Sequence, residues 1–185
     1  MPRSSRVQSA GHAPIADHGE GGRANDVSLR EAEEDDLELL MAWRSNPMVY
    51  QHFTIQNQPL TWEEHLRWWL TRKHRRDWMV LLNDGGRVRS VGSANASRLN
   101  EQVPEVGLYI GESTLWGKGV GRDALTQVLI RLARDGYSHC WAGIQAGNDR
   151  SRRLFERLGF RLVGPSTGRL RYERDITTFS GTPGS

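Results

Sequence analysis

Gly117, Gly119 and Gly121 are the residues whose type and spacing most directly suggest chemistry, because they alternate just before an expected amphipathic helix. The first N–H groups of a helix have no partner within it and carry partial positive charge from the helix dipole, and glycines let an anion approach the backbone closely. Lys118 and Arg122 add positive charge on the outside. The stretch predicts a site for a phosphate-bearing ligand, with a plain glycine-rich turn as the alternative.

Two common phosphate motifs do not fit this stretch. A P-loop has four residues between its first glycine and Gly-Lys-Ser/Thr, whereas five residues separate Gly111 from Gly117, and Gly119 replaces the hydroxyl. A Rossmann fingerprint, G-x-G-x-x-G, opens a parallel sheet, whereas G-x-G-x-G stands here about two-thirds of the way along the chain. Neither motif explains the predicted phosphate site.

A second motif, NDRSRRLFERLGF, runs from Asn148 to Phe160. Together with PEVGLYIGESTLWGKGVGRDAL, it resembles the GNAT N-acetyltransferase superfamily, over roughly residues 27–176. The first motif matches the pattern Q/R-x-x-G-x-G/A, which binds the coenzyme A pyrophosphate, with Trp116 in the Q/R position. W-G-K-G and the early AWRSNP are similar to the branch of ribosomal-protein N-terminal acetyltransferases.

The resemblance implies a mixed α/β fold, with a mostly antiparallel central sheet splayed between strands 105–112 and 138–145 and flanked by helices. Acetyl-CoA is the implied co-substrate, with its pantetheine arm lying in the notch like an extra strand, and no metal is implied. Backbone groups left free by a splay suit such an amide-bearing arm. The positions assigned to acetyl-CoA are Leu108, Tyr109, Ile110, Trp116, Gly117, Lys118, Gly119, Val120, Gly121, Arg122, Asn148, Ser151 and Phe155.

Glu105 is the candidate general base. Attack of an amine on a thioester requires the neutral amine, a held carbonyl and help for the departing thiolate. Many superfamily members place a carboxylate on the fourth strand as the base, which is the position of Glu105. A solvated strand-end glutamate is the alternative, because an amine that binds already neutral needs no base.

Ser151 is the candidate general acid. The superfamily often uses a tyrosine to protonate the thiolate, but Phe155 stands at that position and has no proton to give. The ribosomal branch implies a serine one turn after the asparagine, which is Ser151. A small residue needed for helix packing is the alternative, and Asn148 is expected to cap its helix and to contact the pantetheine arm.

The acceptor side is expected around Trp43, Arg44, His65 and Trp69, because this region lines the acceptor pocket in the superfamily. The aromatic residues suggest a pocket wall, with core packing as the alternative. WRSNP followed by TWEEHLRWWL also looks like enzymes that acetylate the amino group of nucleotide-linked sugars. We favour a small amine or amino sugar as the acceptor, with a polypeptide N-terminus as the other possibility.

Apolar periodicity and turn residues predict the elements that position these side chains. Strands are expected at residues 27–30, 78–82, 87–97, 105–112, 138–145, 160–163 and 169–176. Helices are expected at 34–44, where Pro47 ends the helix, after the Thr61–Glu64 capping box, from Val120 to about Leu132, and after Asn148. The charge run at 72–76, RKHRR, is expected to be a solvated helix end, and Cys140 a core thiol.

Composition describes one ordinary globular domain. The chain has 185 residues, with Lys+Arg 25, Asp+Glu 22, a formal net charge of +3 and one cysteine. These counts exclude a disulfide scaffold, and neither metal-ligand spacing nor a membrane-spanning apolar run is present. We expect a cytoplasmic protein with a disordered tail at 1–25, an acetyltransferase domain at 26–178 and a flexible tail at 179–185, and a homodimer stays open.

Two other function classes compete with an acetyltransferase. A non-catalytic CoA-binding module would keep the fold, and the absence of a tyrosine at Phe155 favours it. A nucleic-acid-binding protein would use RKHRR and the arginines of 150–161. A net charge of +3 provides only a weak field, so nucleic acid is not the expected partner.

Overall fold

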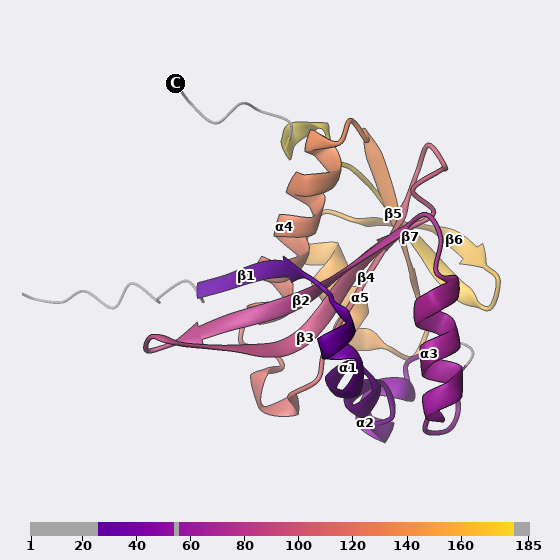
Figure 1. The fold of residues 1–185 in the computed structure, drawn as a ribbon. Helices are drawn as coiled ribbons and strands as arrows, with labels where there is room; N and C mark the ends of the chain where they lie inside the picture. The colour runs from indigo at the N-terminus through magenta and orange to yellow at the C-terminus, as the bar shows by residue number, and fades with distance from the viewer. Residues whose placement is uncertain (1–25, 54–55, 180–185) are drawn as a thin grey trace, which may run out of the picture.

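A computed structural model describes residues 26–53 and 56–179 of the chain. One sheet of seven strands has the order β1-β2-β3-β4-β5-β7-β6, and each neighbouring pair is antiparallel except β4 and β5 (Figure 1). The strands are β1 (Asp26–Glu31), β2 (Arg75–Asp84), β3 (Arg87–Ser97), β4 (Glu105–Ile110), β5 (His139–Ile144), β6 (Arg161–Ser166) and β7 (Arg169–Asp175). The mixed α/β architecture confirms the fold expected from the sequence.

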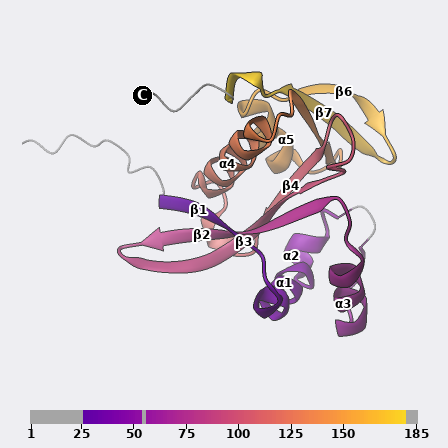
Figure 2. The same ribbon diagram turned by 45° about the horizontal axis from the view of Figure 1, so that its top comes forward.

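Helices cover both faces of this sheet, as Figure 2 shows. On one face lie α4 (Val120–Arg134) and α5 (Asp149–Arg157). On the other face lie α1 (Leu37–Arg44), α2 (Pro47–Tyr50) and α3 (Trp62–Thr71). Short 3-10 turns occur at η1 (Glu34–Asp36), η2 (Ser113–Leu115) and η3 (Thr177–Phe179).

The main core lies between the sheet and α4. The predicted periodicity of α4 is confirmed, because Leu125, Val128 and Leu129 are all fully buried on its inner side. They pack with alternate residues of the strands, including Ala94 on β3 and Cys140 on β5. Cys140 is the expected core thiol, and burial raises its pKa to about 12.

A second, smaller core lies on the opposite face, under α1 and α3. Leu40, Trp43 and Trp69 pack there on Met79 of β2. Trp43 also sits against Gly111 just after β4, where a Cβ would lie 2.2 Å from the indole Cδ1. Only glycine allows this approach, so α1 is docked directly onto the end of β4.

β4 and β5 pair at a single point, Glu105 with Trp141. By contrast, β3 and β4 pair continuously from Gly92 to Ser97. Beyond Glu105 the two parallel strands diverge, and that part of β4 has no β5 partner. This is the splay that the resemblance implied.

The charge run at 72–76 differs from the expected helix end. α3 ends at Thr71, and Arg75 already lies in β2. The Arg72 guanidinium covers the Trp69 ring at 3.1 Å, and Arg75 forms a 2.8 Å ion pair with Asp77. The run therefore follows the helix and enters β2 rather than ending the helix. Lys73, His74 and Arg76 are exposed as predicted, whereas Arg72 and Arg75 are half-buried because they find partners at the helix-to-strand junction.

Two helices on the face of the sheet that carries α1, α2 and α3 begin at short-range capping interactions. Thr61 and Glu64 form the predicted capping box at the start of α3. Pro47 is the first residue of α2, and Asn46 caps that helix by accepting from the Met48 N–H. Pro47 thus both follows the end of α1 and begins the next helix.

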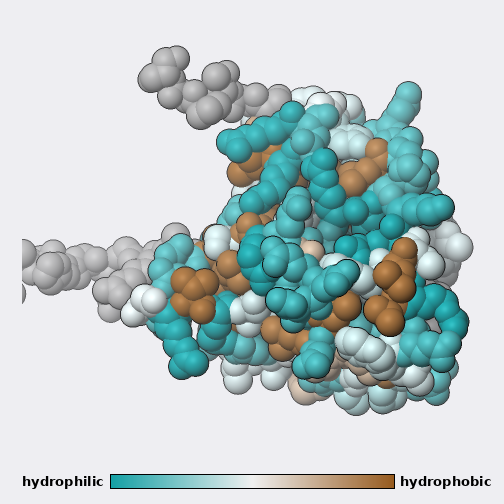
Figure 3. Space-filling model, in the orientation of Figure 1, coloured by the Kyte–Doolittle hydropathy of each residue, from teal (hydrophilic) through white to brown (hydrophobic). Residues whose placement is uncertain are grey.

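The expected tail at 1–25 lies outside the described residues, as does the tail expected at 179–185 except for its first residue. Phe179 packs against the main core, with Arg174 4.6 Å from its ring, so the packed part of the chain extends to this residue. Of the described helices, none is both long enough and apolar enough to cross a bilayer. The face in Figure 3 is mostly hydrophilic, with hydrophobic side chains in separate groups.

Candidate active site

A cleft of about 1230 Å³ crosses the splay between β4 and β5. At one end, here called the glycine end, it is lined by the 115–122 loop and by α5. At the other, the α1–α3 end, it is lined by side chains from α1, α3, β2 and β3. The outer face of β4 lines the cleft between the two ends.

The glycine end presents backbone rather than side chains. Gly119 is the N-cap of α4 and has a left-handed backbone with φ of 89°, which glycine adopts without steric cost. It provides no side-chain cap, so the first N–H groups of α4 have no side-chain acceptor. Gly117 and Gly121 line the cleft beside it, whereas Lys118 does not and the Val120 side chain is buried. This cradle fits a pyrophosphate group.

Trp116 holds the glycine loop against the sheet. Its indole Nε1 donates a 2.8 Å hydrogen bond to the Ile110 carbonyl at the end of β4. The Arg150 guanidinium lies 4.1 Å from its ring centroid, and both residues line the cleft. Arg122 lines the same end. The residue in the Q/R position therefore acts as a brace, and the positive charge comes from Arg122 and Arg150.

α5 brings Asn148 and Ser151 to the cleft. Asn148 is the predicted cap, because its Oδ1 accepts a 3.1 Å hydrogen bond from the Ser151 N–H. Phe155 is 3% exposed and packs edge-on against Phe160, with ring centroids 4.9 Å apart. It does not line the cleft, whereas the Ser151 side chain stands one turn earlier on the cleft wall.

Glu105 lies at the closed end of the splay and is tightly paired. Its carboxylate accepts a 2.7 Å hydrogen bond from Arg169 Nη1 and lies 3.5 Å from Arg98 Nε. The Arg169 side chain crosses Gly143, where a Cβ would lie 2.5 Å from the guanidinium carbon. This ion pair connects β7 to β4 across β5, next to the single contact between Glu105 and Trp141.

Leu108, Tyr109 and Ile110 of β4 also line the cleft. The Tyr109 ring makes edge contacts with Trp43 and Phe53, at centroid distances of 6.4 and 5.8 Å. Burial raises the pKa of the Tyr109 phenol well above its ordinary value, so the hydroxyl keeps its proton at neutral pH.

Of the four residues expected to bind the acceptor, Arg44 alone lines the cleft in the described part of the chain. Trp43 and Trp69 belong to the second core, and the His65 side chain is 0% exposed. His65 lies behind Arg44, with Nδ1 3.3 Å from Arg44 Nη1. Trp68 is the aromatic residue of α3 that reaches the cleft. Trp43, His65 and Trp69 therefore lie behind the cleft wall and support it.

Asp77 and Asn95, which were not predicted from the sequence, lie on the floor of the α1–α3 end. They are register partners on β2 and β3, and the Asn95 amide leans over Gly107 of β4. A signal for them exists in the sequence: Ser93, Asn95 and Ser97 alternate with small apolar residues along β3, which indicates one polar strand face.

The sequence matches the model of the acetyltransferase (GNAT) domain over residues 26–161. An uncharacterised protein of Methanocaldococcus jannaschii is 49% identical over 140 residues, covering 76% of this chain and 29% of that longer protein. A phosphinothricin N-acetyltransferase of Streptomyces coelicolor is 26% identical over 145 residues, covering 75% of this chain and 84% of the relative.

The crystal structure of a domain from Methanocaldococcus jannaschii has the same fold, with a TM-score of 0.80 and 45% identity, covering 82% of this chain and 99% of that one. The family model thus spans most of the chain, and the splayed sheet and glycine cradle agree with it. This chain belongs to the GNAT acetyltransferase family and is an acetyl-CoA-dependent N-acetyltransferase.

Proposed function

We propose that this chain acetylates the primary amine of a small acceptor, with an amino sugar as the leading candidate, by direct attack in a ternary complex. The observation that carries the proposal is one continuous cleft, joining the glycine end to the walled α1–α3 end. Two substrates bound at opposite ends meet at the splay, and such alignment lowers a bimolecular barrier substantially. The relative from Streptomyces coelicolor is named for phosphinothricin, which is also a small amine.

Acetyl-CoA supplies the acetyl thioester. The α4 N-terminus at Gly119 offers N–H donors to its pyrophosphate, and Arg122 adds charge. Residues 108–110 belong to the part of β4 that has no β5 partner, and they offer backbone groups to the pantetheine amides and the thioester carbonyl. Asn148 and Ser151 line the same path from α5.

Two side chains are assigned to proton transfer. Ser151 is proposed to donate a proton to the departing thiolate, because α5 presents its hydroxyl to the cleft where Phe155 cannot act. Glu105 is proposed as the base, but it is held by Arg169 and Arg98. It accepts a proton from the acceptor only after those contacts loosen, and an acceptor that binds as the free amine bypasses this step.

A polypeptide N-terminus is the second candidate acceptor, favoured by the W-G-K-G sequence of the glycine loop. Peptide acceptors bind as extended chains and use backbone hydrogen bonds. The α1–α3 end is instead walled by the side chains of Arg44 and Trp68, which suits a compact ligand.

The test has two stages. Thermal unfolding is followed with acetyl-CoA, CoA, ATP and NAD, since a ligand at about 100 times its dissociation constant stabilises a fold by about 2.7 kcal/mol. Stabilisation by the two CoA species alone is expected. Release of free thiol is then measured with amino sugars, nucleotide-linked amino sugars, phosphinothricin and short peptides. Turnover of peptides alone would overturn the small-acceptor proposal, and CoA binding without any turnover would favour a non-catalytic module.

A further inference from the structure

Arg44 is a half-buried cation on the wall of the α1–α3 end whose charge is not matched by an acid. In the described part of the chain, no carboxylate lies within ion-pair distance of it. Its guanidinium carbon lies over the Trp68 ring, 4.4 Å from the centroid, and Nη1 makes one side-chain hydrogen bond, with His65 Nδ1. Most of its five N–H donors are therefore left for a ligand.

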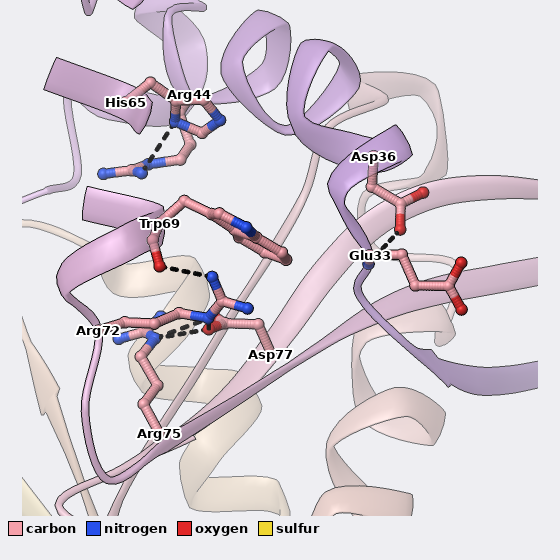
Figure 4. A network of polar contacts seen from close by, with 8 residues as sticks. All are labelled: Glu33, Asp36, Arg44, His65, Trp69, Arg72, Arg75 and Asp77. Atoms are coloured by element: carbon pink, nitrogen blue, oxygen red, sulfur yellow. Dashed lines mark hydrogen bonds and ion pairs between the residues drawn. The ribbon is translucent and has the colours of Figure 1, made fainter. Parts of the chain in front are cut away.

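The neighbouring arginines differ from Arg44 in this respect. Arg75 donates to both oxygens of Asp77, and Arg72 lies 3.9 Å from the same carboxylate (Figure 4). The single negative charge of Asp77 is thus shared between two cations that contact it directly. It lies within electrostatic reach of Arg44 but cannot neutralise a third guanidinium.

His65 fixes the position of the Arg44 guanidinium on the cleft wall. His65 Nε2 lies 3.0 Å from the Leu37 carbonyl, which only accepts, so the ring proton is on Nε2. Nδ1 then carries a lone pair and accepts from Arg44. The imidazole also stacks on Trp68, with ring centroids 5.3 Å apart. A neutral, fully buried ring therefore orients the guanidinium without cancelling its charge.

A half-buried cation without a counter-charge is stabilised by an anion that binds beside it, and a planar guanidinium matches the geometry of carboxylate and phosphate oxygens. We propose that Arg44 is the anchor for an oxyanion of the acceptor, so that the substrates are amines that also carry a carboxylate or a phosphate group. This inference rests on the proposed function, because it assigns the α1–α3 end to the acceptor.

The kinetic test uses matched acceptors with and without the anion. Glucosamine is compared with glucosamine 6-phosphate and with a nucleotide-linked amino sugar, and an amino acid is compared with its amide. For anionic acceptors, Arg44→Gln is expected to raise KM roughly tenfold to a hundredfold with little change in kcat, which is the range for a charge-assisted hydrogen bond. For the uncharged partners, KM stays within about twofold.

Two further variants control for folding and for general charge. Arg67→Gln removes an exposed arginine of α3 that pairs only with Glu63, and it is expected to leave both classes of acceptor unchanged. Arg44→Lys keeps the charge without the planar fork, and it is expected to retain part of the preference for anions. The phosphate and carboxylate pairs show which oxyanion the site accepts.

A binding measurement tests the role of Arg44 without depending on catalytic turnover. Inorganic pyrophosphate is titrated calorimetrically into protein saturated with CoA, which occupies the glycine end. Binding that is lost in Arg44→Gln and kept in Arg67→Gln supports the anchor. Equal binding by both variants, no binding by the unmutated protein, or equal KM effects on charged and uncharged acceptors would overturn it. Failure of the proposed function looks different, because no acceptor is then acetylated although pyrophosphate still binds through Arg44.

Discussion

The two ends of the cleft are built in opposite ways. The glycine end is built mainly from one stretch of chain, residues 115–122, with α5 beside it, and its donors are backbone N–H groups at the start of α4. The α1–α3 end is built from side chains of several elements, including Arg44 on α1 and Asn95 on β3. The glycine end works only while no added side chain blocks its backbone donors. The α1–α3 end works only while neighbouring residues hold its functional side chains in position. Different substitutions should therefore break the two ends.

Gly119→Glu is expected to cause the largest loss. It places a side chain and a negative charge at the N-cap of α4, where the pyrophosphate is proposed to bind, and like charges in contact cost several kcal/mol. Affinity for acetyl-CoA should fall more than about a hundredfold, as measured by calorimetry.

Gly136→Glu is the matched control for this variant. Gly136 follows α4 with φ of +93° and open space around its Cα, so the backbone strain is similar but the cleft is distant. It should lower stability slightly and leave acetyl-CoA affinity unchanged. Normal binding by Gly119→Glu would place the pyrophosphate elsewhere.

Glu105 and Arg169 form the ion pair at the closed end of the splay, which could supply a catalytic base or could simply link β7 to β4. Comparing Glu105→Gln with Arg169→Gln separates these two roles. If Glu105 is the base, its substitution lowers kcat by about a hundredfold or more. Arg169→Gln should then leave the base in place and change kcat far less. The measurement is kcat for each variant at saturating acceptor over a range of pH. Equal losses in both variants would show that the pair acts as a clasp between β7 and β4.

The same contrast explains how much the sequence could predict. Gly117, Gly119 and Gly121 lie within five consecutive positions of the sequence, so a pattern local to one stretch of chain was enough to predict the glycine end and the strand-helix order around it. Trp43, His65 and Trp69 were assigned to the acceptor because their region lines the acceptor pocket in the superfamily and because aromatic residues could form a pocket wall. Which face of α3 turns inward depends on packing against β2, and this packing buries His65 and leaves Trp68 at the cleft. The pairing of Arg75 with Asp77 depends on β2 beginning at Arg75. The expected strand began only at residue 78, so it did not include these two residues.

Gly111→Ala should produce a moderate loss of stability. The added Cβ would lie 2.2 Å from the Trp43 indole, so α1 or the end of β4 must shift, and overpacking of this kind costs about 1–3 kcal/mol. Thermal unfolding measures this loss of stability, which should lower the unfolding temperature by several degrees. Gly147→Ala is the control, because its Cβ meets nothing within 4 Å and its backbone is unstrained. Equal stability of the two variants would contradict the close docking of α1.

The smallest expected effect is a pH dependence of stability from His65. Burial and the adjacent Arg44 cation lower the pKa of His65 below its ordinary value of 6.5. The unfolded chain therefore binds a proton at a higher pH than the folded one. The contribution of His65 is fully present above pH 6.5 and is lost as the pH falls toward the folded pKa, at no more than about 1.4 kcal/mol per pH unit.

Denaturant unfolding of the unmutated protein and of His65→Gln, at several pH values between 7.5 and 5, isolates this contribution. His52 also has a pKa lowered by burial, but it is present in both proteins and cancels in the difference. The unmutated protein should lose more stability than the variant as the pH falls. Parallel curves would show that folding does not change the pKa of His65, which would contradict the effect of its burial and of the adjacent Arg44 cation.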